Sequence, residues 1–329
     1  MQTTRLGRTG LQVSRLCLGT MTFGLQCDEP TSRAILDAAF AGGVTFLDTA
    51  DVYPLGGTLE TVGRTEEIVG RWMKGRRHEV VLATKCNQPM SARPWDKGNS
   101  RKHILDAIDA SLRRLQTDHV DLYQLHLPDP QTPIDESLRA LDDVVRAGKA
   151  RYVGCSNFHA WQVARALGRS EVLGTVRFDS VQPRYSLLFR EFERELFPLC
   201  AEEGVGVIPF NPIAGGMLSG KHRPGPPPEG SRFTLGSSAK LYQERYWNDR
   251  MLATVEQLRP LAAGAGMELV TLAVAWVLAN PVISSAIIGA SRPEQLASSL
   301  KAVDVVLAPE LKARLDELTA EYRRGDAIR

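Results

Sequence analysis

Cysteine is scarce in this chain of 329 residues, and the few cysteines form no pattern. They lie at Cys17, Cys27, Cys86, Cys155 and Cys200. Their number is odd, their spacings are wide and no C-x-x-C pair occurs, whereas disulfide frameworks and zinc sites need evenly paired or closely spaced cysteines. We therefore expect reduced thiols in a cytoplasmic protein, with neither a disulfide framework nor a metal site.

The sequence also lacks a strong excess of charge and a long apolar run. Lys and Arg number 40 against 38 for Asp and Glu, which gives a formal net charge of +2. A nearly neutral balance argues against a protein that coats nucleic acid or a membrane surface. No window reaches the 18 or so apolar residues of a membrane span, and the first residues, MQTTRLGRTGLQVS, lack the apolar core of a signal peptide. We expect no nucleic-acid and no membrane partner; the oligomeric state leaves no signature in these features.

No linker and no stretch of low complexity divides the chain. The length of 329 residues allows two domains or one large α/β barrel. Hydrophobic residues make up 43% of the sequence, which is ordinary for a globular protein and sufficient for a sizeable core. We predict a single domain over residues 1–329.

Short apolar and β-branched runs alternate with amphipathic stretches. Eight runs read as strands, at residues 15–20, 44–50, 80–85, 120–126, 150–157, 178–185, 205–212 and 285–291. Helices are predicted between and after them, at residues 31–41, 101–115, 134–147, 160–167, 191–203 and 293–303. Continuous apolar strands separated by helices indicate a parallel sheet covered by helices. Eight such units predict an α/β protein with a (β/α)8 TIM barrel.

Some segments lie outside the eight repeats. Residues 241–263, 271–278 and 311–324 read as extra C-terminal helices, and residues 222–230, HRPGPPPEG, as a loop. An open doubly wound sheet is the alternative fold, although no G-x-G-x-x-G follows the first predicted strand.

Four ionisable residues fall where a barrel of this kind places its chemistry, at the carboxyl ends of the strands. Asp48, Lys85 and His126 end the second, third and fourth predicted strands, and Tyr53 follows Asp48 in the loop. A nearby ammonium lowers the pKa of a tyrosine, which is ordinarily about 10. Asp48 would hold Lys85, and His126 would orient a carbonyl group. Tyr53 would then protonate the carbonyl oxygen as hydride reaches the carbon, and the hydride implies a nicotinamide cofactor.

Each of these residues also has a purely structural interpretation. Asp48 suits a helix N-cap, Lys85 a solvated charge, Tyr53 a half-buried aromatic and His126 a turn cap before Pro128. A Schiff-base aldolase that uses Lys85 is a further alternative, but Asp48 and Tyr53 suit a charged lysine better than a neutral nucleophile.

An ordered set of segments resembles the aldo-keto reductase superfamily over nearly the whole chain. The segments include LGRTGLQVSRLCLGTMTFG (6–24), FLDTADVY (46–53), ATK (83–85), DLYQLHLPDP (121–130), GCSNF (154–158), PFNPIAGGMLSGK (209–221) and IIGASRPEQL (287–296). The sequence looks most like a bacterial branch that also resembles potassium-channel β-subunits. The resemblance implies NADPH-linked reduction of a small-molecule carbonyl, with Asp48, Tyr53, Lys85 and His126 as the catalytic tetrad and Tyr53 as the general acid.

The same resemblance implies where NADPH or NADP+ would lie. The nicotinamide end would contact Thr20, Met21, Asp48, Ser156, Asn157, Gln182 and Phe210. The pyrophosphate would contact Asn211, Pro212, Ile213, Ala214, Gly215 and Gly216, with Lys221 and Arg232 on the same long segment. The adenosine 2′-phosphate and the adenine would contact Gly289, Ser291, Arg292, Gln295 and Ser299. Many relatives carry acidic and amide residues where this chain has Ser298 and Ser299, and the loop at residues 55–65 departs from the family's short glycine-rich turn.

Two alternatives to a general carbonyl reductase stay open. One is a redox-sensing regulatory subunit that binds NADP(H), although His126 fills a position where channel subunits carry a different polar residue. The other is a reductase of a nucleotide-activated deoxysugar, acting on a 2,3-enone or a ketone. The sequence does not specify the substrate among aldehydes, ketones and sugar-derived carbonyls.

Overall fold

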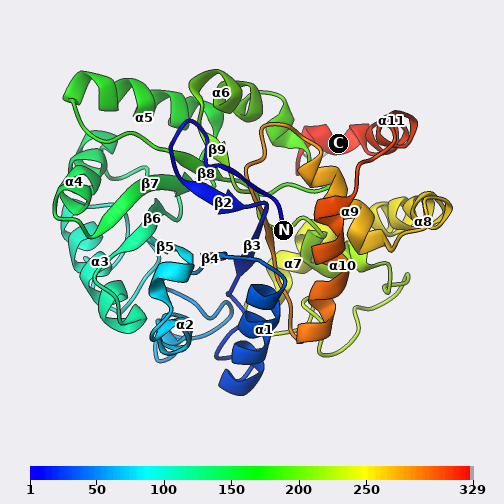
Figure 1. Cartoon of the computed structure of the whole chain (residues 1–329), viewed down its shortest axis with the longest axis horizontal. Helices are drawn as coiled ribbons and strands as arrows, with labels where there is room; N and C mark the ends of the chain where they lie inside the picture. The colour runs from blue at the N-terminus through cyan, green and yellow to red at the C-terminus, as the bar shows by residue number, and fades with distance from the viewer. Residues whose placement is uncertain (327–329) are drawn as a thin grey trace.

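The computed structural model describes residues 1–326, and a sheet of eight parallel strands lies at its centre (Figure 1). The strands are β3 (Leu16–Gly19), β4 (Phe46–Asp48), β5 (Val81–Cys86), β6 (Val120–Leu125), β7 (Ala150–Ser156), β8 (Ser180–Gln182), β9 (Gly206–Val207) and β10 (Ala286–Ile288). Consecutive strands pair with one another, and β10 pairs with β3. The N–H of Ser284 donates to the Val207 carbonyl (2.8 Å) and that of Ile287 to the Pro209 carbonyl (2.9 Å). These bonds join the last strand to β9, and the predicted (β/α)8 fold is confirmed.

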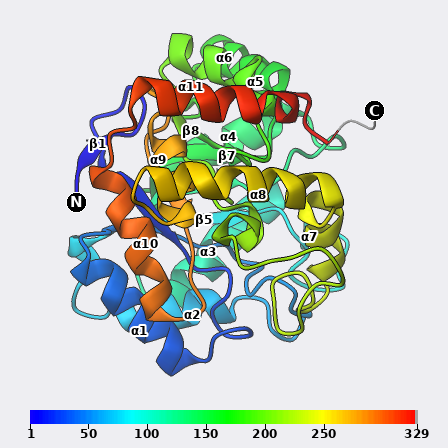
Figure 2. The ribbon, with the colours of Figure 1, turned by 90° about the vertical axis from the view of Figure 1, so that its right-hand side faces the viewer.

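Helices surround the sheet (Figure 1). One follows each strand in turn: α1 (Glu29–Ala41), α2 (Arg64–Met73), α3 (Arg101–Leu115), α4 (Ile134–Arg146), α5 (Ala160–Leu173), α6 (Leu196–Glu203), α9 (Leu269–Leu278) and α10 (Leu296–Lys301). Three further helices are α7 (Ala239–Tyr246), α8 (Asp249–Gly264) and α11 (Pro309–Leu318). Figure 2 shows α8 and α11 lying side by side across one flank. The extra helices are therefore partly an insertion between β9 and α9, and only α11 lies beyond the last repeat.

Several predicted helices differ in extent from the observed ones. The predicted helix at 241–263 is broken into α7 and α8, because Asn248 adopts an extended backbone and its side chain caps α8 by accepting from the Met251 N–H (2.9 Å). The predicted 191–203 and 293–303 helices contain short 3-10 turns, and the final helix ends in one at residues 320–324. Helix α2 was not predicted. Residues 221–230 contain neither helix nor strand, as expected for the predicted loop.

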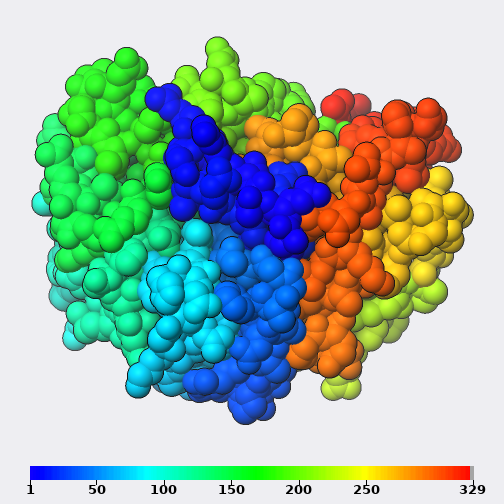
Figure 3. All heavy atoms as spheres, in the orientation of Figure 1, coloured from blue at the N-terminus to red at the C-terminus, as the bar shows by residue number. Residues whose placement is uncertain are grey.

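A short hairpin that the sequence analysis did not predict closes the amino-terminal end of the barrel. Its strands are β1 (Thr3–Arg5) and β2 (Gln12–Ser14), paired antiparallel. Leu6 and Val13 of this hairpin are buried with the lower layer of barrel side chains: Cys17, Phe46, Ala83, Leu122, Ile208 and Ile287. In Figure 3 the hairpin fills the middle of this face of the molecule. The barrel therefore opens at its other end.

The strands alternate so that polar residues form the next layer of the interior. Because side chains on one face of a strand recur every second residue, Asp48 lies one layer above Phe46, Lys85 above Ala83 and Gln124 above Leu122. All three polar residues are buried. This alternation places a polar layer at the carboxyl ends of the strands.

Within residues 1–326, no single helix is both long and apolar enough to cross a membrane, and only α8 and α9 taken together across a 90° bend meet that test. In the same residues no three His, Cys, Asp or Glu side chains are grouped to hold a metal ion. All five cysteines are free thiols, and all are buried.

Candidate active site

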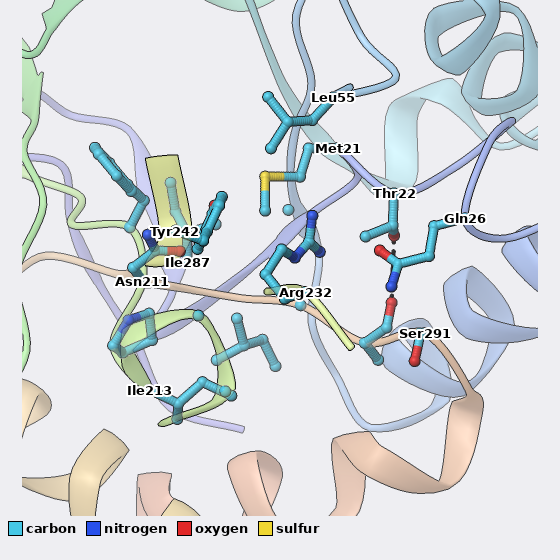
Figure 4. Close-up of a pocket in the computed structure, with 18 of the residues that line it drawn as sticks. Met21, Thr22, Gln26, Leu55, Asn211, Ile213, Arg232, Tyr242, Ile287 and Ser291 are labelled. Carbon is cyan, nitrogen blue, oxygen red and sulfur yellow. Dashed lines mark hydrogen bonds between the residues drawn. The ribbon is translucent and has the colours of Figure 1, made fainter. Parts of the chain in front are cut away.

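A cavity of about 1170 Å³ opens above the polar layer of the barrel. Its walls come from the loop after β3, the loop after β4, the segment after β9, helix α7 and the loop after β10. Figure 4 shows Arg232 reaching toward Met21, with Asn211 and Ile213 on one side and Ser291 on the other. The cavity lies at the end of the barrel where the sequence analysis placed the chemistry.

Lys85 and Asp48 form a buried ion pair at the floor of this cavity. The Lys85 side chain is 0% exposed, and its Nζ lies 2.5 Å from Asp48 Oδ1 and donates to the Thr49 carbonyl at 2.8 Å. Asp48 Oδ2 accepts from Gln182 Nε2 (2.8 Å) and Gln124 Nε2 (3.2 Å). Burial opposes the charged form of Lys85, but the charge of Asp48 and the contact with Tyr53 raise the pKa of Lys85 above its ordinary value. The site therefore holds a fixed positive charge.

Tyr53 lies against this charge at the edge of the cavity. It is 9% exposed, and the Lys85 Nζ is 5.1 Å from the centroid of its ring. Burial raises the pKa of the Tyr53 hydroxyl, and although Lys85 lowers it, the net direction is upward. Lys85 thus lowers the pKa of Tyr53 as expected, but burial raises that pKa by more. Tyr53 stays a neutral phenol at neutral pH and keeps a proton that it can donate.

His126 contacts the Tyr53 ring edge to face, with centroids 5.8 Å apart and an interplanar angle of 83°. Burial and the charge of Lys85 lower the pKa of His126 well below its ordinary value. Its Nδ1 is buried and has no hydrogen-bond partner within residues 1–326. A neutral imidazole beside Tyr53 can orient a polar group in the cavity without adding charge.

Helix α2 holds the loop that carries Tyr53. The backbone N–H groups of Gly63 (3.1 Å) and Thr65 (3.4 Å), at the start of α2, donate to the Tyr53 carbonyl. Glu66 in the first turn is fully buried and accepts from Thr84 Oγ1 (2.6 Å) and Arg114 Nε (2.7 Å). Thr84 directly precedes Lys85, so Glu66 connects the loop of Tyr53 to the strand of Lys85.

The residues predicted to meet a nicotinamide ring line the cavity at the carboxyl ends of β3, β4, β7, β8 and β9. Ser156 Oγ donates to the Gln182 carbonyl (2.9 Å), and Asn157 Nδ2 donates to Ser156 Oγ (3.0 Å). Thr20 Oγ1 donates to the Asp48 carbonyl (3.0 Å). Thr20, Met21 and Phe210 also line the cavity. Their amide and hydroxyl groups beside an aromatic ring match the mixed polarity of a nicotinamide carboxamide.

The segment after β9 exposes its backbone to the cavity. Asn211, Ala214, Gly215 and Gly216 have positive φ angles of 58°, 52°, 67° and 102°. A Cβ at Gly215 would lie 2.6 Å from Tyr242 Cδ1, so a side chain does not fit there, whereas nothing lies within 4 Å of a Cβ at Gly216. Backbone turns of this kind present N–H groups to anions. Asn211, Pro212, Ile213, Gly215 and Gly216 line the cavity, whereas Ala214 is fully buried beneath it.

Cations without acidic partners gather on the same walls. Lys221, Arg232 and Arg292 line the cavity, and in residues 1–326 none of them pairs with a carboxylate. The N–H and Oγ of Ser291 both donate to Gln295 Oε1, at 2.8 and 3.2 Å. Gly289 and Ser299 line the same end, where Ser298 donates to Glu268 (2.8 Å). A polyanionic dinucleotide fits this set of cations without carboxylate partners.

The structure brings together nearly all the residues singled out from the sequence. All line the cavity except Lys85, which lies beneath Tyr53, and Ala214. Gln124, which shares the Asp48 carboxylate with Gln182, was not predicted. The sequence did contain a signal for Gln124, because it lies two residues before His126 and therefore on the same face of the predicted strand. Arg245 and Tyr242 of α7 line the cavity but were not predicted either, because they lie outside the segments that resemble the aldo-keto reductase superfamily.

Comparisons with known proteins bear on this site. A model of the Aldo/keto reductase family matches residues 15–320. The chain is 39% identical to an uncharacterised oxidoreductase of Bacillus subtilis (strain 168) over 326 residues, covering 97% of this chain and 96% of that protein. It is 39% identical over 337 residues to a probable voltage-gated potassium channel subunit beta of Arabidopsis thaliana, with 100% of both chains covered. A versiconal hemiacetal acetate reductase of Aspergillus parasiticus is 34% identical over 349 residues, 96% of each chain.

Proposed function

Since the chain belongs to the aldo/keto reductase family, we propose that it is an NADPH-dependent oxidoreductase that reduces an aldehyde or a ketone to an alcohol. The observation that carries the proposal is the buried Lys85–Asp48 pair beneath Tyr53, at the floor of the cavity. A buried ion pair costs desolvation energy and is a weak source of stability. Its place next to a tyrosine with a retained proton suits acid catalysis.

In this mechanism each residue has a separate task. Tyr53 donates its hydroxyl proton to the carbonyl oxygen of the substrate, which becomes the alcohol oxygen. The Lys85 ammonium stabilises the phenolate that remains, and Asp48 keeps Lys85 charged and in place. His126, as a neutral imidazole, orients the carbonyl beside Tyr53. The nicotinamide, when bound, supplies the hydride that adds to the carbonyl carbon.

The assignment of NADPH as the cofactor is supported by the charge of the cavity. Lys221, Arg232 and Arg292 line it without carboxylate partners in residues 1–326. Ser156, Asn157 and Gln182 would bind the carboxamide of the nicotinamide, and the backbone at 211–216 would bind the pyrophosphate. Arg292 and Ser291 would bind the 2′-phosphate.

A second candidate is a regulatory subunit that binds NADP(H) without turning over a substrate. It is favoured by the full-length similarity to the Arabidopsis thaliana protein, whose name is that of a channel β-subunit. A nucleotide-sugar substrate has less support, because the wall beside Tyr53 is formed by the apolar residues Met21, Val52, Leu55 and Leu127.

A substrate panel separates these candidates. The purified chain is mixed with NADPH and with aliphatic, aromatic and sugar-derived aldehydes and ketones, and the loss of NADPH absorbance is followed. We expect steady turnover of at least one aldehyde, with alcohol formed in equal amount. Tight NADPH binding without turnover of any carbonyl compound would reject the reductase and favour the regulatory subunit.

A further inference from the structure

Arg245 is a further cation of the cavity wall. It lies on α7, is half-buried and lines the same cavity as Tyr53. Within the described residues 1–326, its guanidinium has no hydrogen bond and no carboxylate at ion-pair distance. A half-buried arginine without an acidic partner is uncommon, because burying an uncompensated charge is costly.

A second arginine, close enough for its charge to act on Arg245, is paired with a carboxylate. Arg184 is 6% exposed, its Nη2 pairs with Asp326, and its Cζ lies 3.4 Å from the Phe189 ring centroid. Its Nη1 is buried without a partner in residues 1–326. Burial, and then the charge of Arg184, lower the pKa of Arg245. Asp326 thus pairs with Arg184, and within residues 1–326 the positive charge of Arg245 has no ion-pair partner.

The cavity joins Arg245 to the catalytic residues. Tyr242 precedes Arg245 by three residues on α7, so the two side chains project from neighbouring positions of one helix face. Tyr242 lines the cavity and packs against Gly215. Met21 and Leu55 line the same cavity, lie next to each other in Figure 4 and are joined by a backbone hydrogen bond of 2.9 Å. A molecule bound in this cavity at Tyr53 would therefore meet apolar side chains as well as the Arg245 guanidinium.

We propose that Arg245 is a substrate-binding residue that takes the carboxylate of an oxo acid, a substrate with its carbonyl at Tyr53 and a carboxylate at the other end of an apolar body. The inference rests on the proposed function and names the class of its substrate. A carboxylate matches the single positive charge of Arg245. Arginine also binds a carboxylate through two parallel hydrogen bonds. The other cavity cations, Lys221, Arg232 and Arg292, are occupied by the cofactor phosphates in the proposed function.

The test compares acids with their methyl esters as substrates. The pairs are 4-carboxybenzaldehyde and 6-oxohexanoate, one rigid and one flexible, each with its ester. A charge-assisted hydrogen bond corresponds to a change of about 10- to 100-fold in affinity. We expect the KM of the wild type to be lower for the acid by about that factor. In Arg245→Met the KM for the acid should rise to that for the ester, so that the ratio of the two KM values approaches one.

Two further variants control for charge and for folding. Lys240→Met removes a cation of the same helix whose side chain is 88% exposed and faces away from the cavity lining, and it should leave the acid-to-ester ratio unchanged. Arg245→Lys keeps the charge but loses the paired donors, so its ratio should be intermediate. The thermal unfolding of each variant is measured to check that the fold is retained.

Binding without turnover gives an independent measurement. Calorimetry of 4-methylbenzoate and its methyl ester with the NADP+ complex should show tighter binding of the acid, lost in Arg245→Met. This arm decides the inference even if no aldehyde is reduced, an outcome that would reject the proposed function alone. Equal KM values and equal affinities for acid and ester would overturn the inference. It would also be overturned if Arg245→Met weakened NADPH binding and affected acid and ester alike, because Arg245 would then serve the cofactor.

Discussion

Asp48 is the residue on which the other polar groups of the barrel floor converge. One carboxylate oxygen accepts from Lys85, and the other accepts from Gln124 and Gln182. Because three donors on three different strands share this carboxylate, the position of Lys85 is fixed by the barrel itself. The reactive hydroxyl of Tyr53 is held less directly, through the loop that follows β4. Substitution of Tyr53 therefore tests the chemistry with limited effect on the fold, whereas substitution of Lys85 leaves the buried Asp48 carboxylate without its ion-pair partner.

Removal of the Tyr53 hydroxyl should remove the proton donor and leave the rest of the site nearly unchanged. We expect Tyr53→Phe to lower the rate of carbonyl reduction by about 10²- to 10⁴-fold, the usual contribution of a general acid. The affinity for NADPH should stay within about twofold of the wild type, because the phenyl ring still fills its place beside His126. Single-turnover kinetics and fluorescence titration measure the two quantities. A Phe variant that reduces aldehydes at the wild-type rate would exclude Tyr53 as the acid.

The pH dependence of reduction follows from the directions of the pKa shifts. Burial raises the pKa of Tyr53, so the proton is retained well into the alkaline range. Burial and Lys85 lower the pKa of His126, so it is already neutral at pH 6. We expect kcat for reduction to be constant between about pH 6 and pH 9, below the ordinary tyrosine value of about 10. A steep fall in kcat near pH 7 would contradict this assignment of charge states.

Lys85→Met gives the matching test of the ammonium. Its loss removes the influence that lowers the pKa of Tyr53, so the alkaline decline in rate should move to higher pH while the maximum rate falls. Stopped-flow reduction across the pH range measures both changes.

At the level of elements, helix α2 links the loop that carries Tyr53 to the strand that carries Lys85. Its first N–H groups hold the Tyr53 carbonyl, and its buried Glu66 accepts from Thr84 on β5 and from Arg114 on α3. A substitution in this helix should therefore affect catalysis from outside the cavity. Glu66 acts as a positioning residue, since it touches neither Tyr53 nor Lys85 in the hydrogen bonds described.

Glu66→Ala should lower both stability and turnover. It leaves Thr84 and the largely buried Arg114 without their acceptor, which costs about 2–4 kcal/mol of unfolding free energy. A displacement of Tyr53 by about 1 Å can cost up to about 10²-fold in rate, so kcat should fall while KM changes little. Glu66→Gln keeps an acceptor oxygen and should recover most of the rate. Glu67→Ala, on the same helix with its side chain 50% exposed, is the control. Denaturant unfolding and kcat measure these effects, and equal behaviour of the Glu66 and Glu67 variants would refute the link.

The elements also show what the sequence could predict. All eight barrel strands lie near their predicted positions, because each is an apolar run that forms a continuous core, and Asp48 and Lys85 were found because they end such runs. Helix α2 was missed because Gly70 and the inward-facing Glu66 interrupt its apolar pattern. The hairpin β1–β2 was missed because strands of three residues are too short to show alternation. Arg245 was missed for a different reason, since nothing local shows that an arginine of a surface helix faces a cavity.

At the scale of the whole molecule, barrel closure brings segments of the first and last repeats to one wall of the cavity. Strand β10 pairs with β3, and α10 packs against α1 (Figure 2). Thr22 Oγ1 donates to the Ala290 carbonyl (3.3 Å), and Cys27 Sγ lies 3.7 Å from the Ser291 carbonyl. The loop proposed to hold the 2′-phosphate is thus supported by residues more than 260 positions away in the sequence. Arg232 approaches the same end of the cavity from the segment after β9 (Figure 4).

This assembly predicts a preference for NADPH over NADH. The exposed Arg292 has no acidic partner in residues 1–326, and Ser291 offers an N–H and a hydroxyl that now reach only Gln295. A 2′-phosphate would gain these donors, whereas the hydroxyl of NADH would not. We expect the double variant Ser291→Ala, Arg292→Ala to bind NADPH about 10- to 100-fold more weakly, as for the loss of a charge-assisted contact, and to bind NADH as the wild type does. Lys301→Ala, which removes an exposed cation of α10 outside the cavity lining, is the control. Fluorescence titration with both cofactors measures the preference, and equal wild-type affinities for the two would remove the phosphate from this loop while leaving the tetrad in place.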